Sequence, residues 1–243
     1  MSPAKAWIAS IVRLAAAAAF LIAASCARTP SHDHAVARDE SLPNLGLVKA
    51  DLLAYGTNGA YASDLATAVG AAETYVLARA SQARNPALVL DIDETSLSNW
   101  DQLVANDFGY FAQGGCDFLP KGPCGALKWD ELGRANAIAP TLHLFDAAQH
   151  AGVKVFFITG RREAERVWTE SNLARAGYHD WQQLVMMPDG MDATAAAYKA
   201  GARAEIESKG FTIIANVGDQ QSDLDGGHAE RVFKLPNPFY FIR

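Results

Sequence analysis

The chain has 243 residues, of which 50% are hydrophobic and 20% are charged, so it is long and apolar enough to bury a full core. Its 21 basic and 27 acidic residues give a net charge of −6, and no basic stripe stands out along it. This balance argues against nucleic-acid polymers as partners. Length and composition indicate a single α/β domain, with or without a cap.

The first 25 residues differ in composition from the rest. Lys5 and Arg13 precede the apolar run LAAAAAFLIAAS, which ends in small residues. Charge, length and ending predict a secretory signal peptide over residues 1–25. The run is too short for a membrane span, which needs about 20 apolar residues.

Cys26 closes the sequence AASC, which resembles the lipobox of bacterial lipoproteins. The resemblance implies lipidation of Cys26, and Ala27 after it favours the outer membrane. Ordinary cleavage nearby is the alternative and would leave a periplasmic protein. Residues 26–43 are polar and predict a flexible tether, so the only expected membrane contact is the lipid anchor.

Helical periodicity predicts a short helix over 47–55 and a longer one over 63–83, within an N-terminal helical segment at 44–85. From residue 86 strands and helices alternate. The expected strands are ALVLDID, VKVFFITG, QQLVMMP, FTIIANVGD and RVFKLP. The expected helices are TLHLFDAAQHAG, REAERVWTESNLARAG and ATAAAYKAGARAEIESKG.

This alternation predicts a Rossmann-like parallel sheet with helices on both faces, over residues 86–243. Ligands of such sheets bind beyond the carboxyl ends of the strands. About forty residues separate the first strand from the next helix, far more than an ordinary connection. We therefore expect a cap, inserted at about residues 100–138.

Cys116 and Cys124 lie eight positions apart in the Gly- and Pro-rich stretch GGCDFLPKGPCG of the cap. In an exported protein this spacing favours a loop-closing disulfide. Two unpaired thiols are the alternative. A metal site is disfavoured because no nearby His or further Cys completes a ligand set.

Acidic residues crowd the end of the first strand in VLDIDETSLSNW. Asp91 and Asp93 are two apart and should project to the same side. One carboxylate could attack phosphorus and form an acyl phosphate, while the other protonates the leaving alcohol and then activates water. This chemistry needs a cation, and Mg²⁺ bound by carboxylates is expected. Asp219 and Asp223, in GDQQSD after the fourth strand, are the further ligands that the pattern offers.

The four segments DIDET, FFITGR, YKAGAR and VGDQQSD, in this order, resemble the motifs of the haloacid dehalogenase (HAD) superfamily of phosphatases. DIDETSLSN followed by a long cap is similar to its class B branch, subfamily IIIB. That branch includes bacterial lipoprotein acid phosphatases and plant vegetative storage proteins. The predicted signal peptide favours the bacterial type, which hydrolyses nucleoside 5′-monophosphates and other small phosphomonoesters.

The resemblance implies a role for each motif residue. Asp91 would be the nucleophile and a metal ligand, and Asp93 the acid and base, with its backbone carbonyl facing Mg²⁺. Asp219 and Asp223 would complete the metal site. The residues expected to bind the substrate are Thr159, Gly160, Arg161 and Lys199, of which Thr159 and Lys199 also act on the phosphoryl group.

Several assignments have competitors in the sequence. Lys209, at a helix end, competes with Lys199, although it suits a capping role. Asp225 could replace Asp223 as a ligand. Arg161 could contact the substrate or only begin the next helix. The aromatic residues of the cap could stack on a nucleobase or form its small core. These are Trp100, Phe108, Tyr110 and Phe111.

The six histidines do not match the nucleophile segment of histidine phosphatases, so we expect surface or packing roles for most of them. The sequence thus predicts an exported, Mg²⁺-dependent phosphomonoesterase that acts on small phosphate esters through an aspartyl phosphate. One rival is another phosphotransfer reaction on the same core. The other is a storage or binding lipoprotein that retains the fold, although Asp91 argues against a silenced site. The sequence leaves homo-oligomerisation open.

Overall fold

The computed structural model describes residues 42–242. The expected signal peptide, Cys26, and the tether up to residue 41 lie outside the described residues, as do His32 and His34. From Pro43 onward the chain forms one compact unit. Within residues 42–242, no helix combines the length and the apolar character that crossing a membrane would require.

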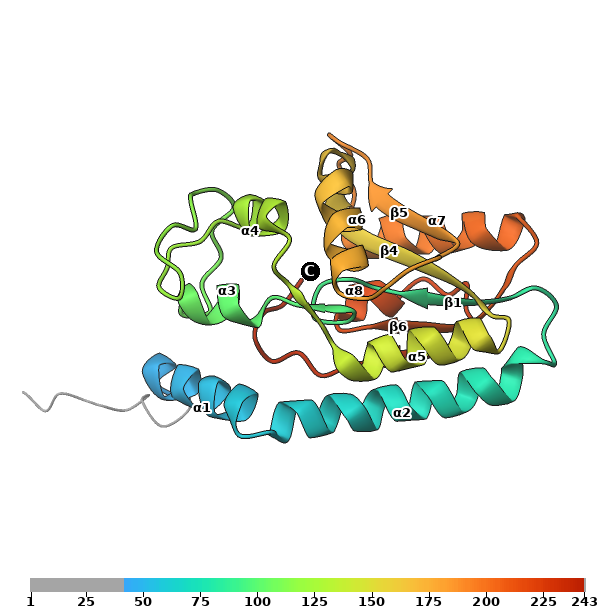
Figure 1. The fold of residues 1–243 in the computed structure, drawn as a ribbon, viewed down its shortest axis with the longest axis horizontal. Helices are drawn as coiled ribbons and strands as arrows, with labels where there is room; N and C mark the ends of the chain where they lie inside the picture. Colours follow the sequence, from blue (N-terminus) through green and yellow to red (C-terminus); the bar gives the residue numbers. More distant parts are fainter. Residues whose placement is uncertain (1–41, 243) are drawn as a thin grey trace, which may run out of the picture. The chain divides into compact units, whose positions relative to one another are not determined.

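Five parallel strands form the central sheet, and they match the five that the sequence predicts (Figure 1). Their order across the sheet is β5-β4-β1-β6-β7, so the first strand along the chain lies in the middle. The strands are β1 (Pro86–Leu90), β4 (Lys154–Arg162), β5 (Gln183–Met187), β6 (Thr212–Gly218) and β7 (Arg231–Lys234). The predicted α/β fold is confirmed.

Alternating side chains of β1 enter two separate cores because successive residues of a strand face opposite sides of the sheet. Leu88 and Leu90 join the core under the N-terminal helices, and Ala87 and Val89 join the core on the other face. Both faces are covered, which explains why this strand is almost continuously apolar. Beyond residue 138 the helices are α5 (Ala139–His150), α6 (Arg166–Arg175), α7 (Ala195–Ser208) and α8 (Gln221–Leu224), and the 3₁₀ turn η1 (Glu163–Glu165) precedes α6.

Two N-terminal helices precede the sheet. Helix α1 (Leu45–Thr57) begins at Asn44, whose Oδ1 accepts a hydrogen bond from Gly46 N at 2.9 Å. Helix α2 (Ala60–Ala80) begins three residues earlier than predicted and packs against α5. Its buried residues recur every three or four positions, as an amphipathic helix requires, and are Tyr61, Leu65, Val69, Ala72, Val76 and Ala80.

The segment expected to form the cap, residues 100–138, contains α3 (Trp100–Ala105), α4 (Ala126–Leu132) and β3 (Asn136–Ala137). Strand β3 pairs antiparallel with β2 (Leu97–Ser98), which closes the base of the segment. Figure 1 shows α3 and α4 beside the sheet, above α1. These short helices were not predicted from the sequence.

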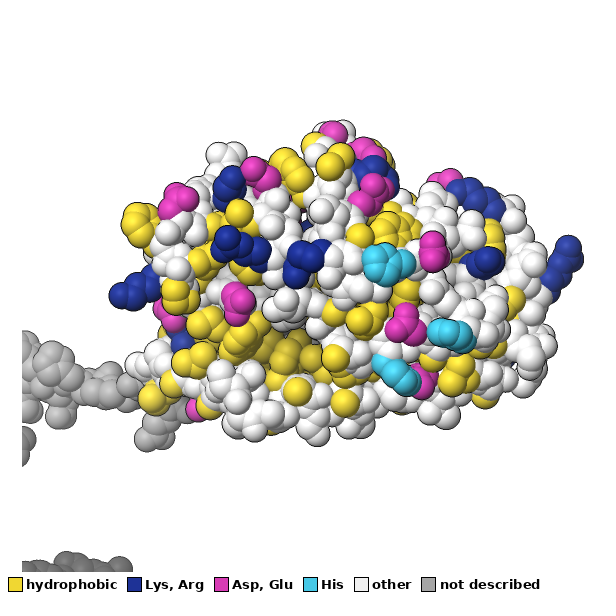
Figure 2. Space-filling view, in the orientation of Figure 1, with side chains coloured by type: hydrophobic (Ala, Val, Ile, Leu, Met, Phe, Trp, Pro, Cys, Tyr) yellow, Lys and Arg dark blue, Asp and Glu magenta, His cyan; other side chains and the backbone are white. Residues whose placement is uncertain are grey.

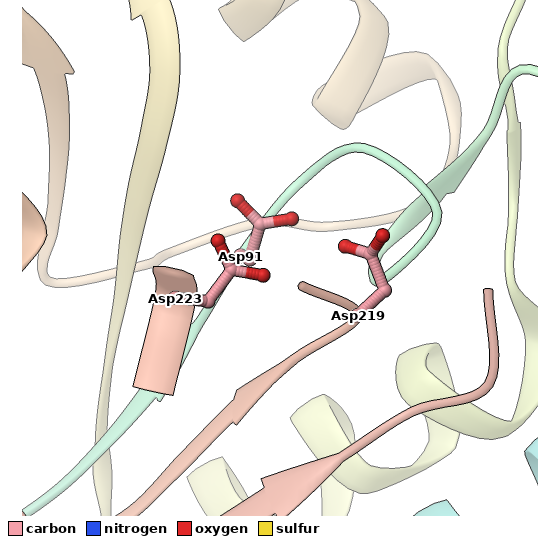
Figure 3. A group of neighbouring side chains, drawn as sticks. All are labelled: Asp91, Asp219 and Asp223. Atoms are coloured by element: carbon pink, nitrogen blue, oxygen red, sulfur yellow. The ribbon is translucent and has the colours of Figure 1, made fainter. Parts of the chain in front are cut away.

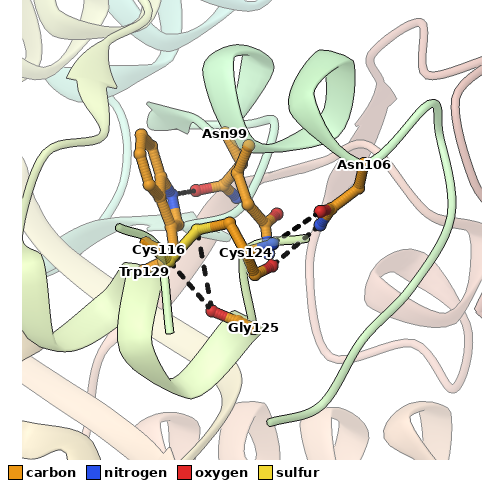
Figure 4. Close-up of a disulfide and its surroundings, with 7 residues drawn as sticks. Asn99, Asn106, Cys116, Cys124, Gly125 and Trp129 are labelled. Atoms are coloured by element: carbon orange, nitrogen blue, oxygen red, sulfur yellow. Dashed lines mark hydrogen bonds between the residues drawn. A yellow bond between two sulfur atoms is a disulfide. The ribbon is translucent and has the colours of Figure 1, made fainter. Parts of the chain in front are cut away.

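The expected disulfide is present between Cys116 and Cys124 (Figure 4). Both cysteines are buried. Asn106, at the end of α3, fixes the loop because its side chain accepts from Cys124 N and donates to Cys124 O, both at 2.8 Å. The loop is therefore fastened to α3 as well as to itself.

Trp100 and Phe108 form a core with Phe239 from the C-terminal segment, at ring centroid distances of 5.3 and 5.9 Å. Trp100 also lies against Gly56 of α1, where an added Cβ would come within 2.0 Å of the indole. Figure 2 shows hydrophobic side chains gathered between the cap and the N-terminal helices. Tyr110 and Phe111 are exposed instead. Of the two alternatives for the cap aromatics, Trp100 and Phe108 have the packing role.

Candidate active site

The motif residues meet at the carboxyl edge of the sheet. Asp91 follows β1 directly, Thr159 lies in β4, and Asp219 follows β6 directly. Because β4 and β6 are the two neighbours of β1, their ends flank Asp91. Asp223 on α8 and Lys199 on α7 reach the same place from helices.

Three buried carboxylates lie together at this edge (Figure 3). Asp91, Asp219 and Asp223 each offer an oxygen, and these oxygens lie within 4.8 Å of one another. Burying like charges at this separation is unfavourable unless a cation compensates them. Hard carboxylate oxygens suit a divalent ion of the Mg²⁺ or Ca²⁺ type. The donor set therefore fits a divalent metal, as the sequence predicts.

Lys199 lies between two of these carboxylates. Its Nζ donates to Asp91 Oδ1 at 2.5 Å and to Asp223 Oδ1 at 2.6 Å. Burial acts to lower the pKa of Lys199, but the attraction of the two carboxylates outweighs it and raises that pKa. Burial raises the pKa of Asp91, and Lys199 opposes that effect. The ammonium thus stays charged beside the expected nucleophile.

The competing residues lie elsewhere. Lys209 follows the last residue of α7 and pairs with Glu205 at 2.9 Å. Asp225 is exposed and outside the carboxylate group. The four histidines that the structure describes, His143, His150, His179 and His228, are all exposed. They match the expected surface roles.

The carboxylate of Asp93 is outside the metal group and pairs with Arg161. Arg161 Nη2 donates to Asp93 Oδ1 at 2.6 Å, and Nε donates to Oδ2 at 3.1 Å. Burial acts to raise the pKa of Asp93, but Arg161 outweighs it and holds that pKa below its ordinary value. Arg161 lies within β4, so it does not begin a helix. The metal contact expected of the Asp93 backbone carbonyl stays a prediction.

Thr159 and Gly160 form the floor of the expected phosphate site. Thr159 is fully buried, and its Oγ1 accepts a hydrogen bond from Arg161 N at 3.1 Å. Its own hydroxyl hydrogen remains free to donate. Gly160 is exposed, and no atom lies within 4 Å of the position that a Cβ would take. The space beside Gly160 is therefore unfilled by the protein.

The family model for the HAD superfamily, subfamily IIIB (acid phosphatase), matches residues 16–243. The chain belongs to this family. Acid phosphatase 1 of Solanum lycopersicum is 39% identical over 156 residues, which are 63% of this chain and 58% of the tomato protein. Vegetative storage protein 1 of Arabidopsis thaliana is 31% identical over 174 residues, which are 70% of this chain and 62% of that protein.

The alignments thus span about six tenths of the length of these two relatives. Among solved structures, the class C acid phosphatase from Bacillus anthracis superposes with a TM-score of 0.62 at 20% identity. This similarity covers 80% of this chain and 86% of that one, and it supports the fold assignment.

Polar residues that the sequence did not point to hold the carboxylates of this candidate site in place. Asn237 Nδ2 and Gln220 Nε2 each donate to Asp219 Oδ2 at 2.7 Å. Thr95 Oγ1 donates to the other oxygen at 3.1 Å. Gln220 is the chain neighbour of Asp219, whereas Thr95 and Asn237 are distant from it in the sequence, so no local sequence signal could reveal these two contacts. Such partners orient a metal ligand and fix its charge.

Arg203 secures the short helix that carries Asp223. It is fully buried, and its Nη1 donates to Asp223 O at 2.6 Å while Nε donates to Gly227 O at 2.8 Å. Asn216 Nδ2 adds a third hydrogen bond, to Asp223 O at 2.9 Å. The conspicuous basic residue of the YKAGAR segment besides Lys199 therefore positions a ligand of the candidate metal site.

A further buried carboxylate links the site to the C-terminal segment. Glu94 accepts hydrogen bonds from Asn99 N at 2.6 Å and from Tyr240 Oη at 2.7 Å. Burial raises the pKa of Glu94 to about 8. Asn99 also donates to Asp93 Oδ1 at 2.8 Å. It accepts a hydrogen bond from Trp129 Nε1 at 2.8 Å (Figure 4). One asparagine thus connects the expected acid and base to the cap.

Proposed function

We propose that this protein is a phosphomonoesterase that uses Mg²⁺ and forms an aspartyl phosphate on Asp91. The observation that carries the proposal is the position of Lys199, whose ammonium contacts Asp91 and Asp223 inside the buried carboxylate group. A fixed cation beside a buried nucleophile is what phosphoryl transfer needs. Asp91, Asp219 and Asp223 would hold the metal, which supplies positive charge to the phosphoryl oxygens when bound.

In the first step, a carboxylate oxygen of Asp91 attacks phosphorus and the bond from phosphorus to the leaving oxygen breaks. Asp93 gives a proton to that oxygen, and the alcohol departs. Because Arg161 lowers the pKa of Asp93, the protonated form that this step uses is a minor one that acid pH favours. Lys199 and the hydroxyl of Thr159 stabilise the charge on the phosphoryl oxygens. The product of this half-reaction is phosphorylated Asp91.

In the second step, water attacks the same phosphorus atom and the bond to Asp91 breaks. The carboxylate of Asp93 accepts the proton of that water, which restores the starting state. Asp93 suits both halves because its side chain is 31% exposed, whereas that of Asp91 is 8% exposed. The base that meets water is thus the more accessible of the two carboxylates.

We propose small phosphomonoesters as substrates, including nucleoside 5′-monophosphates. A pocket of about 310 Å³ in the cap supports this choice. Its lining includes Trp100 and Trp129 together with Arg134 and Asp101, so it offers apolar surface, one cation and one carboxylate. Trp129 is two hydrogen bonds from Asp93, through Asn99. Asn99 thus connects the lining of this pocket to the expected acid.

We propose that the protein is exported, with residues 1–25 as signal peptide and Cys26 as the lipid attachment site for the outer membrane. The disulfide between Cys116 and Cys124 supports an oxidising compartment. Mass spectrometry of the mature N-terminus tests this proposal. A diacylglycerol-modified Cys26 would support the anchor, and an unmodified N-terminus nearby would exclude it.

Phosphate release by the purified full-length protein tests the enzymatic proposal. Substrates are p-nitrophenyl phosphate and the nucleoside 5′-monophosphates, with Mg²⁺ or with EDTA. We expect metal-dependent turnover that Asp91→Asn lowers by at least about a thousandfold, because this change removes the nucleophile. No turnover by a folded, Mg²⁺-loaded protein would favour a storage role, as in the Arabidopsis relative's name.

A further inference from the structure

Arg161 contacts two acidic side chains next to the candidate site, Asp93 and Asp130. Besides Asp93, it pairs with Asp130 of α4 at 3.0 Å, and Glu165 raises its pKa as the other two do. Its side chain is 4% exposed. A guanidinium this deeply buried has few alternative positions, so its carboxylate partners hold it in place.

The contacts of Arg161 fix both the place and the plane of its guanidinium. Nε and Nη2 form a fork on the two oxygens of Asp93, and Nη2 also reaches Asp130. A two-pronged contact sets the rotation of a carboxylate about its own axis, which a single contact cannot do. Asn99 adds a third donor on Asp93 Oδ1.

We propose that Arg161 is the positioning residue for Asp93, and that Asp130 makes its position depend on the cap. This inference rests on the phosphatase function proposed above. Arg161 sets the direction in which the Asp93 carboxyl presents its proton to the leaving oxygen. Asp130 lies on α4, which packs against η1 and α6, so the docked cap holds the fork.

Placement of the acid affects some substrates far more than others. Departure of an alkoxide requires a proton, whereas p-nitrophenolate is a stable anion that leaves without one. The value of kcat/KM covers steps up to the first irreversible one, here departure of the alcohol. A misplaced Asp93 should therefore reduce kcat/KM for alkyl phosphates and leave p-nitrophenyl phosphate nearly unchanged. A general loss of structure would reduce both.

The test compares Arg161→Lys with the wild type on β-glycerophosphate and p-nitrophenyl phosphate. Lysine keeps the buried positive charge but cannot form the fork, so the change isolates geometry from charge. General acid catalysis contributes about 10²–10⁴ in rate, and we expect kcat/KM for the alkyl ester to fall at least about tenfold. For the aryl ester we expect a change of less than about threefold.

Arg162→Lys is the matched control. Arg162 lies next in the same strand, but its guanidinium donates to Pro188 O and Met191 O, away from Asp93. We expect it to leave the ratio between the two esters unchanged. Inhibition by inorganic phosphate and thermal unfolding report whether the phosphate site and the fold survive in each variant.

Asp130→Asn tests the contribution of the cap and serves if Arg161→Lys does not fold. It leaves the fork intact and replaces the carboxyl group beside Nη2 with an amide. We therefore expect kcat/KM for the alkyl ester to fall about two- to fivefold, and kcat/KM for the aryl ester to stay nearly unchanged. Equal loss on both esters, or no loss on either, would overturn the positioning role of Arg161. Unchanged selectivity in Asp130→Asn would overturn the link to the cap. If the wild type hydrolyses neither ester, the phosphatase proposal fails first, and this inference fails with it.

Discussion

Asp130 is a carboxyl group whose proton contributes to stability. Burial raises its pKa to about 8, from an ordinary value of 3.8, although Arg161 opposes the shift. Asp93 and Glu165 also face it and raise its pKa further. A folded-state pKa above the unfolded one means that folding takes up a proton. The stabilisation that the protonated Asp130 gives the folded state is therefore complete below about pH 4, and it is lost as the pH rises through about 8.

Asp130→Asn should remove this pH dependence. Asparagine keeps the shape but does not titrate, so we expect the stability of the variant to decline less between pH 4 and pH 8 than that of the wild type. The free energy of unfolding of the wild type should fall more steeply with pH than that of the variant, by at most roughly 1.4 kcal/mol per pH unit, which is the value for one proton. Urea unfolding at several pH values with EDTA present measures it. Parallel curves for the two proteins would show that Asp130 does not hold the proton.

Individual site residues could be predicted when their role follows from residue type and position after a strand. Asp91, Asp219, Asp223 and Lys199 are brought together where the sequence predicts. Asn99, Arg203 and Asn237 could not be predicted, because each forms a hydrogen bond with a residue about twenty or more positions away, which for Asn99 is Trp129. Arg161 was left open because its partners are set by tertiary packing, which spacing does not encode.

At the scale of elements, the contact between α1 and the cap rests on a glycine. A Cβ at Gly56 would lie 2.0 Å from the indole of Trp100, so the helix or the ring must move. We expect Gly56→Ala to destabilise the protein by about 1–3 kcal/mol, as overpacking does. Gly70→Ala in α2 is the control, since no atom lies within 4 Å of its Cβ position and the site is exposed.

The control should be stabilised by roughly 0.5–1 kcal/mol, because alanine favours a helix interior more than glycine does. Thermal and urea unfolding of both variants measure the difference. Equal stability of the two alanine variants would mean that α1 or the indole of Trp100 can move to accommodate the added methyl group at no cost in stability, so their contact would not be tightly packed.

The disulfide closes a short loop within the cap. Replacing both cysteines, Cys116→Ser with Cys124→Ser, should reduce stability by about 2–3 kcal/mol, the value for a loop of about nine residues. Dithiothreitol should lower the unfolding temperature of the wild type and leave that of the double variant unchanged. A wild type that is insensitive to reductant while its thiols are shown to be free would contradict this.

The helices and strands of the core could be predicted more fully than those of the cap. Each core strand carries a run of apolar residues and each core helix a buried stripe, and such patterns are local. Helices α3 and α4 have 6 and 7 residues, too short for a periodic signal. Their conformation depends on the disulfide, on Asn106 and on packing against Phe239.

For the whole molecule, the three-carboxylate group predicts that metal binding and folding are coupled. Asp91 meets Asp219 and Asp223 only in the folded chain, because more than a hundred residues separate them in the sequence, so the proposed Mg²⁺ site exists only after folding. At a concentration of 100 times the dissociation constant, a ligand specific for the folded state adds about 2.7 kcal/mol. We expect Mg²⁺ to raise the unfolding temperature and EDTA to lower it.

Asp219→Asn should reduce this Mg²⁺ response, because an amide oxygen is a weaker ligand than a carboxylate. Asp225→Asn, on an exposed carboxylate outside the group, should leave the response unchanged. Differential scanning calorimetry across a Mg²⁺ series makes the comparison. Equal responses in both variants would place the metal elsewhere.

The order of the strands, unlike their positions, could not be read from the pattern. The central strand β1 comes first in the sequence, and its two neighbours, β4 and β6, come much later in the chain. Ala87 aligns with Lys154 of β4 on one side and with Ile213 of β6 on the other. Pairings between such distant segments form slowly, because the intervening chain must be ordered before they gain any contact.

Until those pairings form, the apolar β1 has two uncovered edges, and its residues 87–90 can pair with the same segment of another chain. Refolding should therefore compete with aggregation, and the yield of native protein should fall as the protein concentration rises. The strand that ends at the nucleophile is thus also the strand through which the chain is most exposed to misassembly.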